Sequence, residues 1–402
     1  MASDSGRPAR KITDETIEAV QRRIGIPVRR RDRPHAVVTT ADSIRHFANG
    51  IGQDDPIHCD PEYGNASPWG SVIAPPLYYS ATGSPVPVEW TPEQAEAMSG
   101  GDPLAGIGQY MIREEWVFHR PVRPGDEIQR REELYSVEER PRSVDGRRTL
   151  WVTHLFTHLG ADGTVFAETH RMFHHADRDR SGAGGQHDSV PFESANYDAD
   201  AYAEIDAAYA AETVRGAEPR NIKDVAVGDS IGRIVRGPLT VGDVISYHVG
   251  IGWGGFGVGS TRLAWRRRQR MPKLFVPNSQ GVLDTVQRCH WEDEWAQSLG
   301  QPLAYDYGAM RSNWATSLIR NWMGDTGWLW RFESRIRRFN HRGDTTWFSG
   351  TVVAVDPGQG RVDVEIAGVN QRGTQTCTAT ASILLPLEGD QLPRIPERVQ
   401  AH

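Results

Sequence analysis

Apolar and polar residues follow two different patterns along this 402-residue chain. Short β-branched and apolar runs separated by Gly- and Pro-containing turns predict antiparallel strands. They occupy residues 114–122, 126–135, 150–159, 164–173, 347–355, 361–368 and 376–385. A helical period predicts helices at residues 14–24, 41–48, 199–212 and 311–323, the last with Trp314, Leu318 and Trp322 on one face. Helices and strands in this mixture predict an α+β protein.

The same landmarks occur twice, in the same order. Thr40 and the Gly50–Gly52 turn recur 200 residues later at Thr240 and Gly250–Gly252, and His58 recurs 232 residues later at His290. Gly125-Asp126 recurs as Gly343-Asp344. An internal repeat of this length predicts two diverged copies of one folding unit. We therefore expect the halves to pack as a pseudo-dimer with one continuous sheet covering two central helices.

These landmarks divide the chain into four segments. They are an N-terminal arm (1–34), a first unit (35–175), a linker with a helix (176–220) and a second unit (221–396). We expect the linker helix to pack between the units. Between its Gly turn and its His, the second unit has 32 extra residues (232 minus 200). Because long loops in compact domains are often functional, we expect residues 253–280 to cover a site in the second unit, although a solvated loop is the alternative.

Composition excludes several classes of protein. A net charge of -7 argues against nucleic acid as a partner. The chain has neither a secretory N-terminus nor an apolar run of about 20 residues, so we expect a cytoplasmic protein without membrane segments. Cys59, Cys289 and Cys377 have no disulfide or zinc spacing. We expect no metal and no cofactor.

One stretch carries a family resemblance. Gln53-Asp54-Asp55-Pro56-Ile57-His58-Cys59-Asp60, which follows a helix and precedes Val72-Ile73-Ala74-Pro75-Pro76, resembles the Asp-x-Asn-Pro-Leu-His-x-Asp motif of MaoC-like dehydratases and R-specific enoyl-CoA hydratases. The resemblance implies a double hot-dog fold, in which two tandem hot-dog units each wrap a central helix in antiparallel sheet. It also implies a hydro-lyase, either an enoyl-thioester hydratase or a 3-hydroxyacyl-thioester dehydratase. The substrate would be carried by coenzyme A or acyl carrier protein, and the pairing of hot-dog units also allows a homodimer.

Both copies depart from this motif. In the first, Gln53 replaces the catalytic Asp and Asp55 replaces the Asn; in the second, only His290 is kept. We favour the second copy because its helix can begin at Gly308, whose N–H is free to bind an oxyanion, whereas Pro75 and Pro76 block the equivalent start. We expect His290 to act as general acid and base with Asp284 as its carboxylate.

The sequence also allows other catalytic residues and other functions. His58 with Asp54 or Asp55 is the alternative catalytic set, and either His can instead be a structural turn residue. The candidate substrate contacts flank the two motifs, the helix start and the insertion: Gln53, Tyr307, Trp253, Trp291 and Arg266. A hot-dog thioesterase, or a non-catalytic acyl-binding or scaffolding subunit, would also fit the incomplete motifs.

Overall fold

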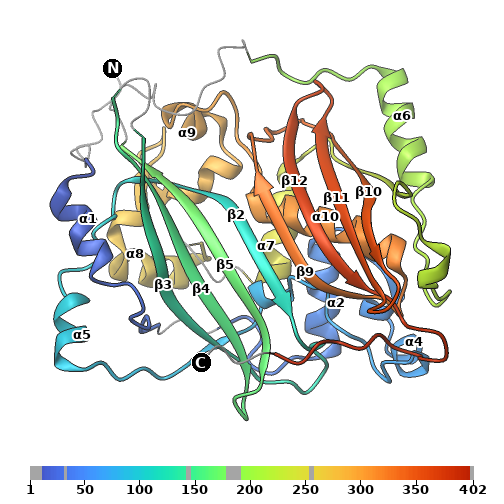
Figure 1. The fold of residues 1–402 in the computed structure, drawn as a ribbon. Coiled ribbons are helices and arrows are strands. Elements are labelled where there is room, and N and C mark those ends of the chain that lie inside the picture. Colours follow the sequence, from blue (N-terminus) through green and yellow to red (C-terminus); the bar gives the residue numbers. More distant parts are fainter. Residues whose placement is uncertain (1–10, 31–33, 142–145, 178–191, 253–257, 399–402) are drawn as a thin grey trace.

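The two halves of the chain share one ten-stranded sheet (Figure 1). A computed structural model describes residues 11–30, 34–141, 146–177, 192–252 and 258–398. The strand order is β1-β3-β4-β5-β2-β9-β12-β11-β10-β6. The halves join where β2 (Gly108–Phe118) pairs antiparallel with β9 (Trp328–Ile336). The prediction of one continuous sheet is confirmed.

The first half follows the predicted elements closely. Its helices are α1 (Asp14–Gln21), α2 (Ala41–Gly50), α3 (Pro56–Cys59), α4 (Pro61–Ala66) and α5 (Pro92–Ala97). Its remaining strands are β1 (Ser84–Pro85), β3 (Ile128–Arg140), β4 (Thr149–Gly160) and β5 (Val165–Ala176). Thr13 caps α1, and Thr40 forms a capping box with Ser43 at the start of α2, so both predicted helix starts are confirmed.

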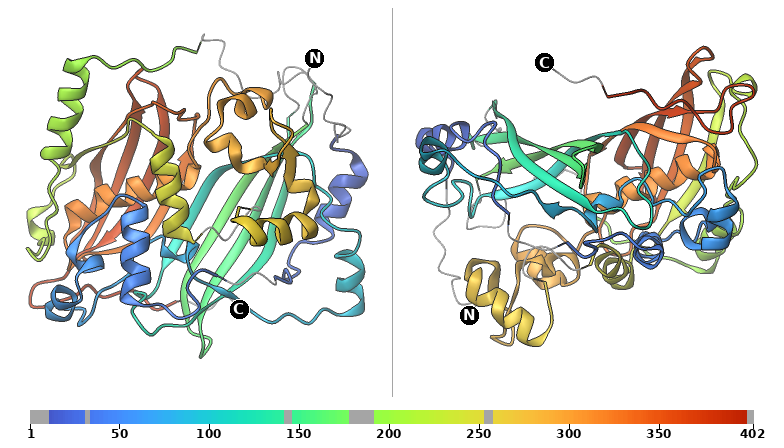
Figure 2. Two further views of the ribbon diagram at one scale, coloured as in Figure 1. Left: turned by 180° about the vertical axis from the view of Figure 1, so that it is seen from behind. Right: turned by 90° about the horizontal axis from the view of Figure 1, so that it is seen from below.

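The second half repeats this order with longer helices. Its helices are α6 (Ala199–Ala210), α7 (Val241–Ile251), α8 (Thr261–Arg270), α9 (Asp293–Ser298) and α10 (Gly308–Met323). Its strands are β6 (Ser230–Arg236), β10 (Thr346–Asp356), β11 (Arg361–Asn370) and β12 (Gln375–Leu384), and the short hairpin of β7 (Phe275–Pro277) and β8 (Leu283–Thr285) lies in the insertion. Figure 2 shows α8 and α9 on the same side of the sheet as α2 and α7.

The repeated glycines mark the contact between the two copies. Helices α2 and α7 pack against each other. A Cβ atom on Gly50 would lie 2.6 Å from the Cα of Gly250, which is closer than carbon atoms can approach. The Gly-Ile-Gly motif is therefore repeated because the two helices cross there with backbone against backbone.

Within the described ranges, the second half alone has a long central helix. Helix α10 is buried along almost its whole length, and its Trp314 and Leu318 belong to a core that also contains Phe47 and Trp116 of the first half. At the equivalent place the first half has one 3-10 turn, Tyr78–Ser80. The expectation of two central helices is wrong, because prolines precede this turn and Gly83, Pro85 and Pro87 follow it, so no helix can continue.

Two further expectations concern the surroundings of the core. Helix α6 lies at the outer edge of the sheet beside β6, so the expectation that it packs between the units is wrong (Figure 1). None of the helices within the described ranges is long and apolar enough to cross a membrane.

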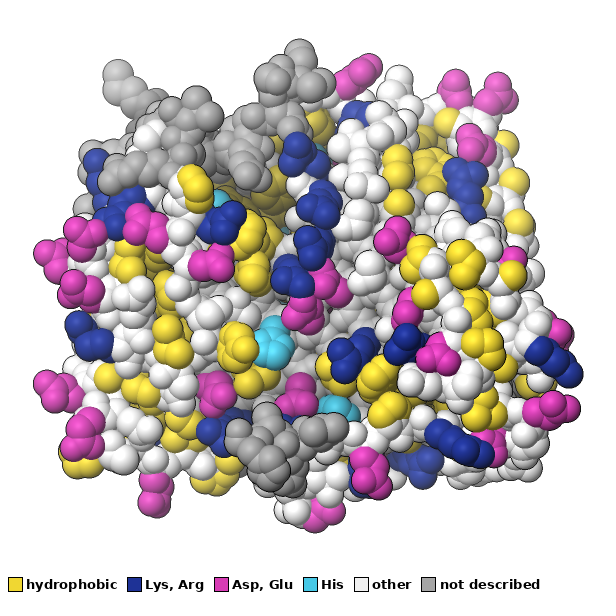
Figure 3. Space-filling view, viewed as in Figure 1, with side chains coloured by type: hydrophobic (Ala, Val, Ile, Leu, Met, Phe, Trp, Pro, Cys, Tyr) yellow, Lys and Arg dark blue, Asp and Glu magenta, His cyan; other side chains and the backbone are white. Residues whose placement is uncertain are grey.

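On the outer face of the sheet, seen in Figure 3, charged side chains bridge the β2–β9 junction, where Arg113 pairs with Glu333 at 2.7 Å.

Candidate active site

The two motif histidines occupy equivalent places in the two halves. The Nδ1 atom of His58 lies 2.6 Å from the carbonyl oxygen of Ile73, and the Nδ1 atom of His290 lies 2.8 Å from that of Tyr305. The two carbonyls are 232 residues apart, the same offset as the histidines. A carbonyl can only accept, so Nδ1 carries the proton in each ring, and the lone pair of a neutral imidazole lies on Nε2.

In the second half, His290 lies beside the start of the central helix. Its ring stacks on that of Tyr307, with ring centroids 3.6 Å apart. Tyr307 is the residue immediately before α10, and no side chain caps the helix. The backbone N–H groups at the start of this 16-residue helix, beginning with Gly308, therefore point toward the region beside His290 and carry the positive end of the helix dipole.

Side chains from two elements hold Tyr307 in place. Its hydroxyl lies 2.8 Å from Nε2 of His248 on α7 and donates to Oε1 of Gln287 at 3.0 Å. Burial lowers the pKa of His248 to about 4 and raises the pKa of Tyr307. Burial likewise lowers the pKa of His290 to about 4, against the opposing effect of the nearby carbonyls of Tyr305 and Asp306. At neutral pH both imidazoles are uncharged, as a general base requires.

The expected carboxylate partner does not contact His290. The Asp284 carboxylate accepts a hydrogen bond from the N–H of Thr285, and no hydrogen bond or ion pair joins it to His290 in the described parts of the chain. The nearest acidic residue in sequence to the helix start, Asp306, is buried, and burial raises its pKa to about 6. It forms an ion pair with Arg311 at 2.8 Å. Both carboxylates therefore have partners other than the His290 ring.

The other predicted contacts of the second half are spread out. Trp291 is half-buried, with its ring 6.0 Å from that of His248. Arg266 is exposed on α8, within an insertion segment that has five arginines and no acidic residue between positions 261 and 270. Trp253 lies outside the described residues. The structure therefore places Tyr307 against His290, Trp291 near His248, and Arg266 on a separate basic helix.

The first half holds its motif in a closed, charged interior. Asp55 lies 3.2 Å from Arg320 of α10, and Arg320 also pairs with Asp325 at 2.8 Å, all three side chains being almost fully buried. His58 is 1% exposed, and burial together with the charge of Arg320 lowers its pKa to about 4. Asp54 is exposed. The first motif thus uses its carboxylate to anchor the central helix of the other half.

A small cavity adjoins His58. Its volume is about 30 Å³, enough for one water molecule. Residues from both halves line it, including Pro75, Pro76, Tyr79, Phe118, Arg320 and Trp328. The Nε2 of His58 and the Oε1 of Gln53 are buried without a hydrogen-bond partner in the described chain. Pro75 and Pro76 in the cavity lining stand where the second half begins α10. Among the residues described, no three His, Cys, Asp or Glu side chains are grouped as a metal site would require.

Sequence reasoning overlooked two groups of this arrangement. His248 matches Ala48 at the 200-residue offset. The replacement of a small residue by an imidazole in the second copy could have marked this position as part of the site. Arg320 stands within the otherwise buried central helix, and only the fold reveals that its partner is Asp55. Both residues act between segments that lie far apart in the chain.

Known proteins share this architecture. Residues 29–157 match the family model of the FAS1-like dehydratase domain region. A solved MaoC-like dehydratase superposes with a TM-score of 0.61 at 19% identity, covering 91% of this chain and 100% of its own. The chain has the double hot-dog fold of the MaoC-like dehydratases. The predicted resemblance and fold class are confirmed.

Two further solved structures resemble this chain at lower similarity. A putative MaoC domain protein dehydratase from Chloroflexus aurantiacus J-10-fl superposes with a TM-score of 0.52 at 12% identity, over 91% of this chain and 96% of that one. A conserved hypothetical protein from Mycobacterium tuberculosis, described as having a double hotdog fold, gives a TM-score of 0.47 at 14% identity over 87% and 93%. A comparison with curated protein sequences found no match.

Proposed function

We propose that this protein is a hydro-lyase that interconverts 2-enoyl and 3-hydroxyacyl thioesters, and that the reaction takes place in its second half. The observation that carries the proposal is the combination of a neutral His290 with the uncapped start of α10 at Gly308. Hydration of an enoyl thioester needs a base for water and a donor for the thioester oxygen, and these two groups supply both.

A single imidazole can perform both proton transfers. In hydration, Nε2 of His290 takes a proton from water as the water oxygen bonds to Cβ and the electrons of the double bond move toward the thioester oxygen. The N–H groups at Gly308 and Ala309 stabilise the negative charge on that oxygen. The imidazolium then returns its proton to Cα as the thioester carbonyl re-forms. Both hydrogens of the water and its oxygen end in the 3-hydroxyacyl product, and dehydration is the reverse.

The aromatic ring of Tyr307 stabilises the protonated form of His290, as a carboxylate partner would. The imidazolium formed during the reaction lies against the face of this ring, and an aromatic face attracts a cation. The contacts of Tyr307 with His248 and Gln287 keep the ring in this position. We assign His290 and Gly308 catalytic roles, and His248 and Gln287 positioning roles. His58 and Asp55 belong to the binding half.

The carrier of the acyl group would be recognised outside the reaction centre. Helix α8 exposes Arg262, Arg266 and Arg270 at four-residue spacing on one face. Coenzyme A and acyl carrier protein both present phosphate groups, which such a row can bind. Changing the three arginines to Ser should raise KM for a thioester substrate, most strongly at low ionic strength, and leave kcat almost unchanged.

Turnover of crotonyl-CoA tests the proposal directly. Loss of enoyl absorbance without release of free thiol supports the hydro-lyase, whereas free thiol identifies a thioesterase. We expect His290→Ala to lower kcat by about 10²–10⁴ while circular dichroism shows an unchanged fold. The matched variant His58→Ala should mainly raise KM. A dead His58→Ala variant beside an active His290→Ala variant would move the reaction to the first half, and inactivity of the unmodified protein toward all enoyl thioesters would favour a non-catalytic acyl-binding subunit.

A further inference from the structure

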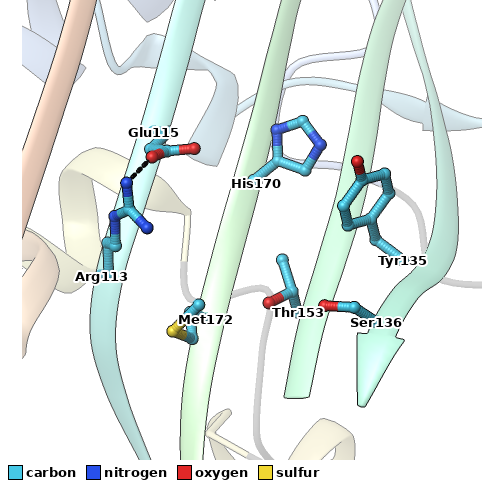
Figure 4. A pocket seen from close by; sticks show the side chains of 7 residues that line it. All are labelled: Arg113, Glu115, Tyr135, Ser136, Thr153, His170 and Met172. Atoms are coloured by element: carbon cyan, nitrogen blue, oxygen red, sulfur yellow. Dashed lines mark hydrogen bonds and ion pairs between the residues drawn. The ribbon is translucent and has the colours of Figure 1, made fainter. Parts of the chain in front are cut away.

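The inner face of the first half-sheet, which points toward the helices, carries a group of polar side chains beside its aromatic ones. We define it by Glu114 of β2, Glu132 of β3, His154 and His158 of β4, and Thr169 and Arg171 of β5. Strand register places these side chains together, because Glu114 pairs with Arg171, Trp116 with Thr169, and His154 with Arg171. The alternate residues of the same strands form the outer face, where a shallow pocket is lined by Arg113, Glu115, Thr153 and His170 among others (Figure 4).

Several inner-face atoms are buried without a hydrogen-bond partner. Across the described ranges, both ring nitrogens of His158, the hydroxyl of Thr169 and one carboxylate oxygen of Glu114 have none. These side chains are 2%, 1% and 1% exposed, respectively. Leaving a buried polar group without a partner is unfavourable, so native proteins seldom keep several side by side unless something else binds them.

The equivalent face of the second half is different. There α10 packs on a sheet whose inward residues include Leu329, Phe332, Val364 and Ile383, all part of the main core. In the described part of the first half, the chain makes a 3-10 turn at 78–80 in the place of this helix. On the first half-sheet, by contrast, the buried polar side chains of Glu114, His158 and Thr169 lie beside the apolar Trp116 and Phe118 of the main core.

This face continues into the proposed reaction centre. Tyr247 of α7 lies with its ring 5.8 Å from that of Tyr307, and the charges of Arg171 and Glu114 both act on its hydroxyl. At the helix start, a Cβ atom on Gly308 would lie 3.3 Å from Cε of Met111 on β2. The first half-sheet therefore borders the helix start at which the proposed thioester would lie.

We infer that the acyl group carried by this protein's substrate bears oxygen atoms along its chain, as hydroxyl, carbonyl or carboxylate groups, and is not a plain hydrocarbon. The inference rests on the proposed function for the position of the thioester. Thr169 and a neutral His158 can each donate a hydrogen bond, and Glu114 can accept one. A hydrocarbon chain would leave all of these groups unpaired. It would also gain less binding free energy from leaving water, because the surface that it meets is polar.

Binding measured without turnover tests this inference separately from the reaction. Calorimetric titration of the unmodified protein would use saturated acyl-CoA thioesters of four and six carbons, each ending in a methyl, a hydroxyl or a carboxylate group. We expect one of the oxygen-bearing series to bind at least tenfold more tightly than the methyl series. Equal or tighter binding of the methyl series, or no binding of any series, would overturn the inference.

Variants locate the preference on the inner face. Thr169→Val and His158→Leu should reduce the preference for the oxygen-bearing series at least fivefold. The matched control Thr153→Val changes the same residue type on the outer face of the neighbouring strand and should leave the preference unchanged. An equal effect of Thr153→Val would refute the assignment to this face. If oxygen-bearing thioesters bind but their 2-enoyl forms are never hydrated, the proposed reaction fails while the binding inference stands.

Discussion

Replacement of Tyr307 by Leu isolates the contribution of the aromatic ring beneath His290. The two ring centroids are 3.6 Å apart with an interplanar angle of 29°, so the charge that forms on His290 during proton transfer faces the Tyr ring. A desolvated cation–aromatic contact stabilises by roughly 2 kcal/mol, which corresponds to a fall in kcat of about 30-fold when it is lost. KM should change little, because His290 is neutral before the reaction begins.

Tyr307→Phe is the matched control, since it keeps the ring and removes only the hydroxyl. That hydroxyl contacts His248 and Gln287 inside the protein, so its loss should cost about 1–3 kcal/mol of folding stability but less than fivefold in kcat. The assay is the initial rate of loss of enoyl absorbance, normalised to the folded fraction by circular dichroism. A Leu variant with the kcat of the unmodified protein, or a Phe variant as slow as Leu, would refute the role of the aromatic face.

Three further predictions concern stability. Arg320→Met leaves two buried aspartates without their cation and should lower the free energy of unfolding by about 3–5 kcal/mol in urea titrations, with a smaller loss counting against the buried ion network. The pKa of His58 falls from 6.5 to about 4 on folding, so the unfolded chain binds a proton at this residue before the folded protein does. The free energy of unfolding should therefore be highest above pH 6.5 and decline as the pH falls toward 4, with about 3 kcal/mol of the decline due to His58. His58→Gln should flatten the decline. Gly50→Ala should lower the thermal midpoint of unfolding, because the added Cβ forces α2 and α7 apart. The control Gly358→Ala should leave the midpoint unchanged, because its Cβ would lie 3.5 Å from the nearest atom. Similar midpoints for the two variants would contradict the close helix crossing.

Local signals in the sequence identified most elements of this fold. Thr13 and Thr40 marked helix starts because a hydroxyl cap acts within three residues, and the strand hairpins followed from turns and β-branched runs. The repeated Gly50 and His58 revealed two copies, since equivalent residues meet equivalent local demands in each. The missing central helix was also readable in principle, because the prolines and glycine from Pro75 to Pro87 prevent it.

The candidate site was only partly accessible in this way. The structure brings His290, Tyr307 and Gly308 together, since they are linked through one short stretch of chain and a repeated motif. Asp284 was expected beside His290 from its sequence distance alone, yet its carboxylate binds the adjacent backbone N–H. The assignment of chemical roles to these residues stays a prediction.

The sequence by itself determined what depends on neighbours along the chain: the caps, the turns, the strand alternation and the duplication. Tertiary structure decided which distant groups meet. It placed Arg320 between the aspartates of two different segments, set His248 against Tyr307, and aligned the polar residues of four strands on one face. The reason is physical: hydrogen bonds of caps and turns form over a few residues, whereas burial, which controls the ionisation of these histidines and the pairing of these charges, is created only when the two halves close on each other.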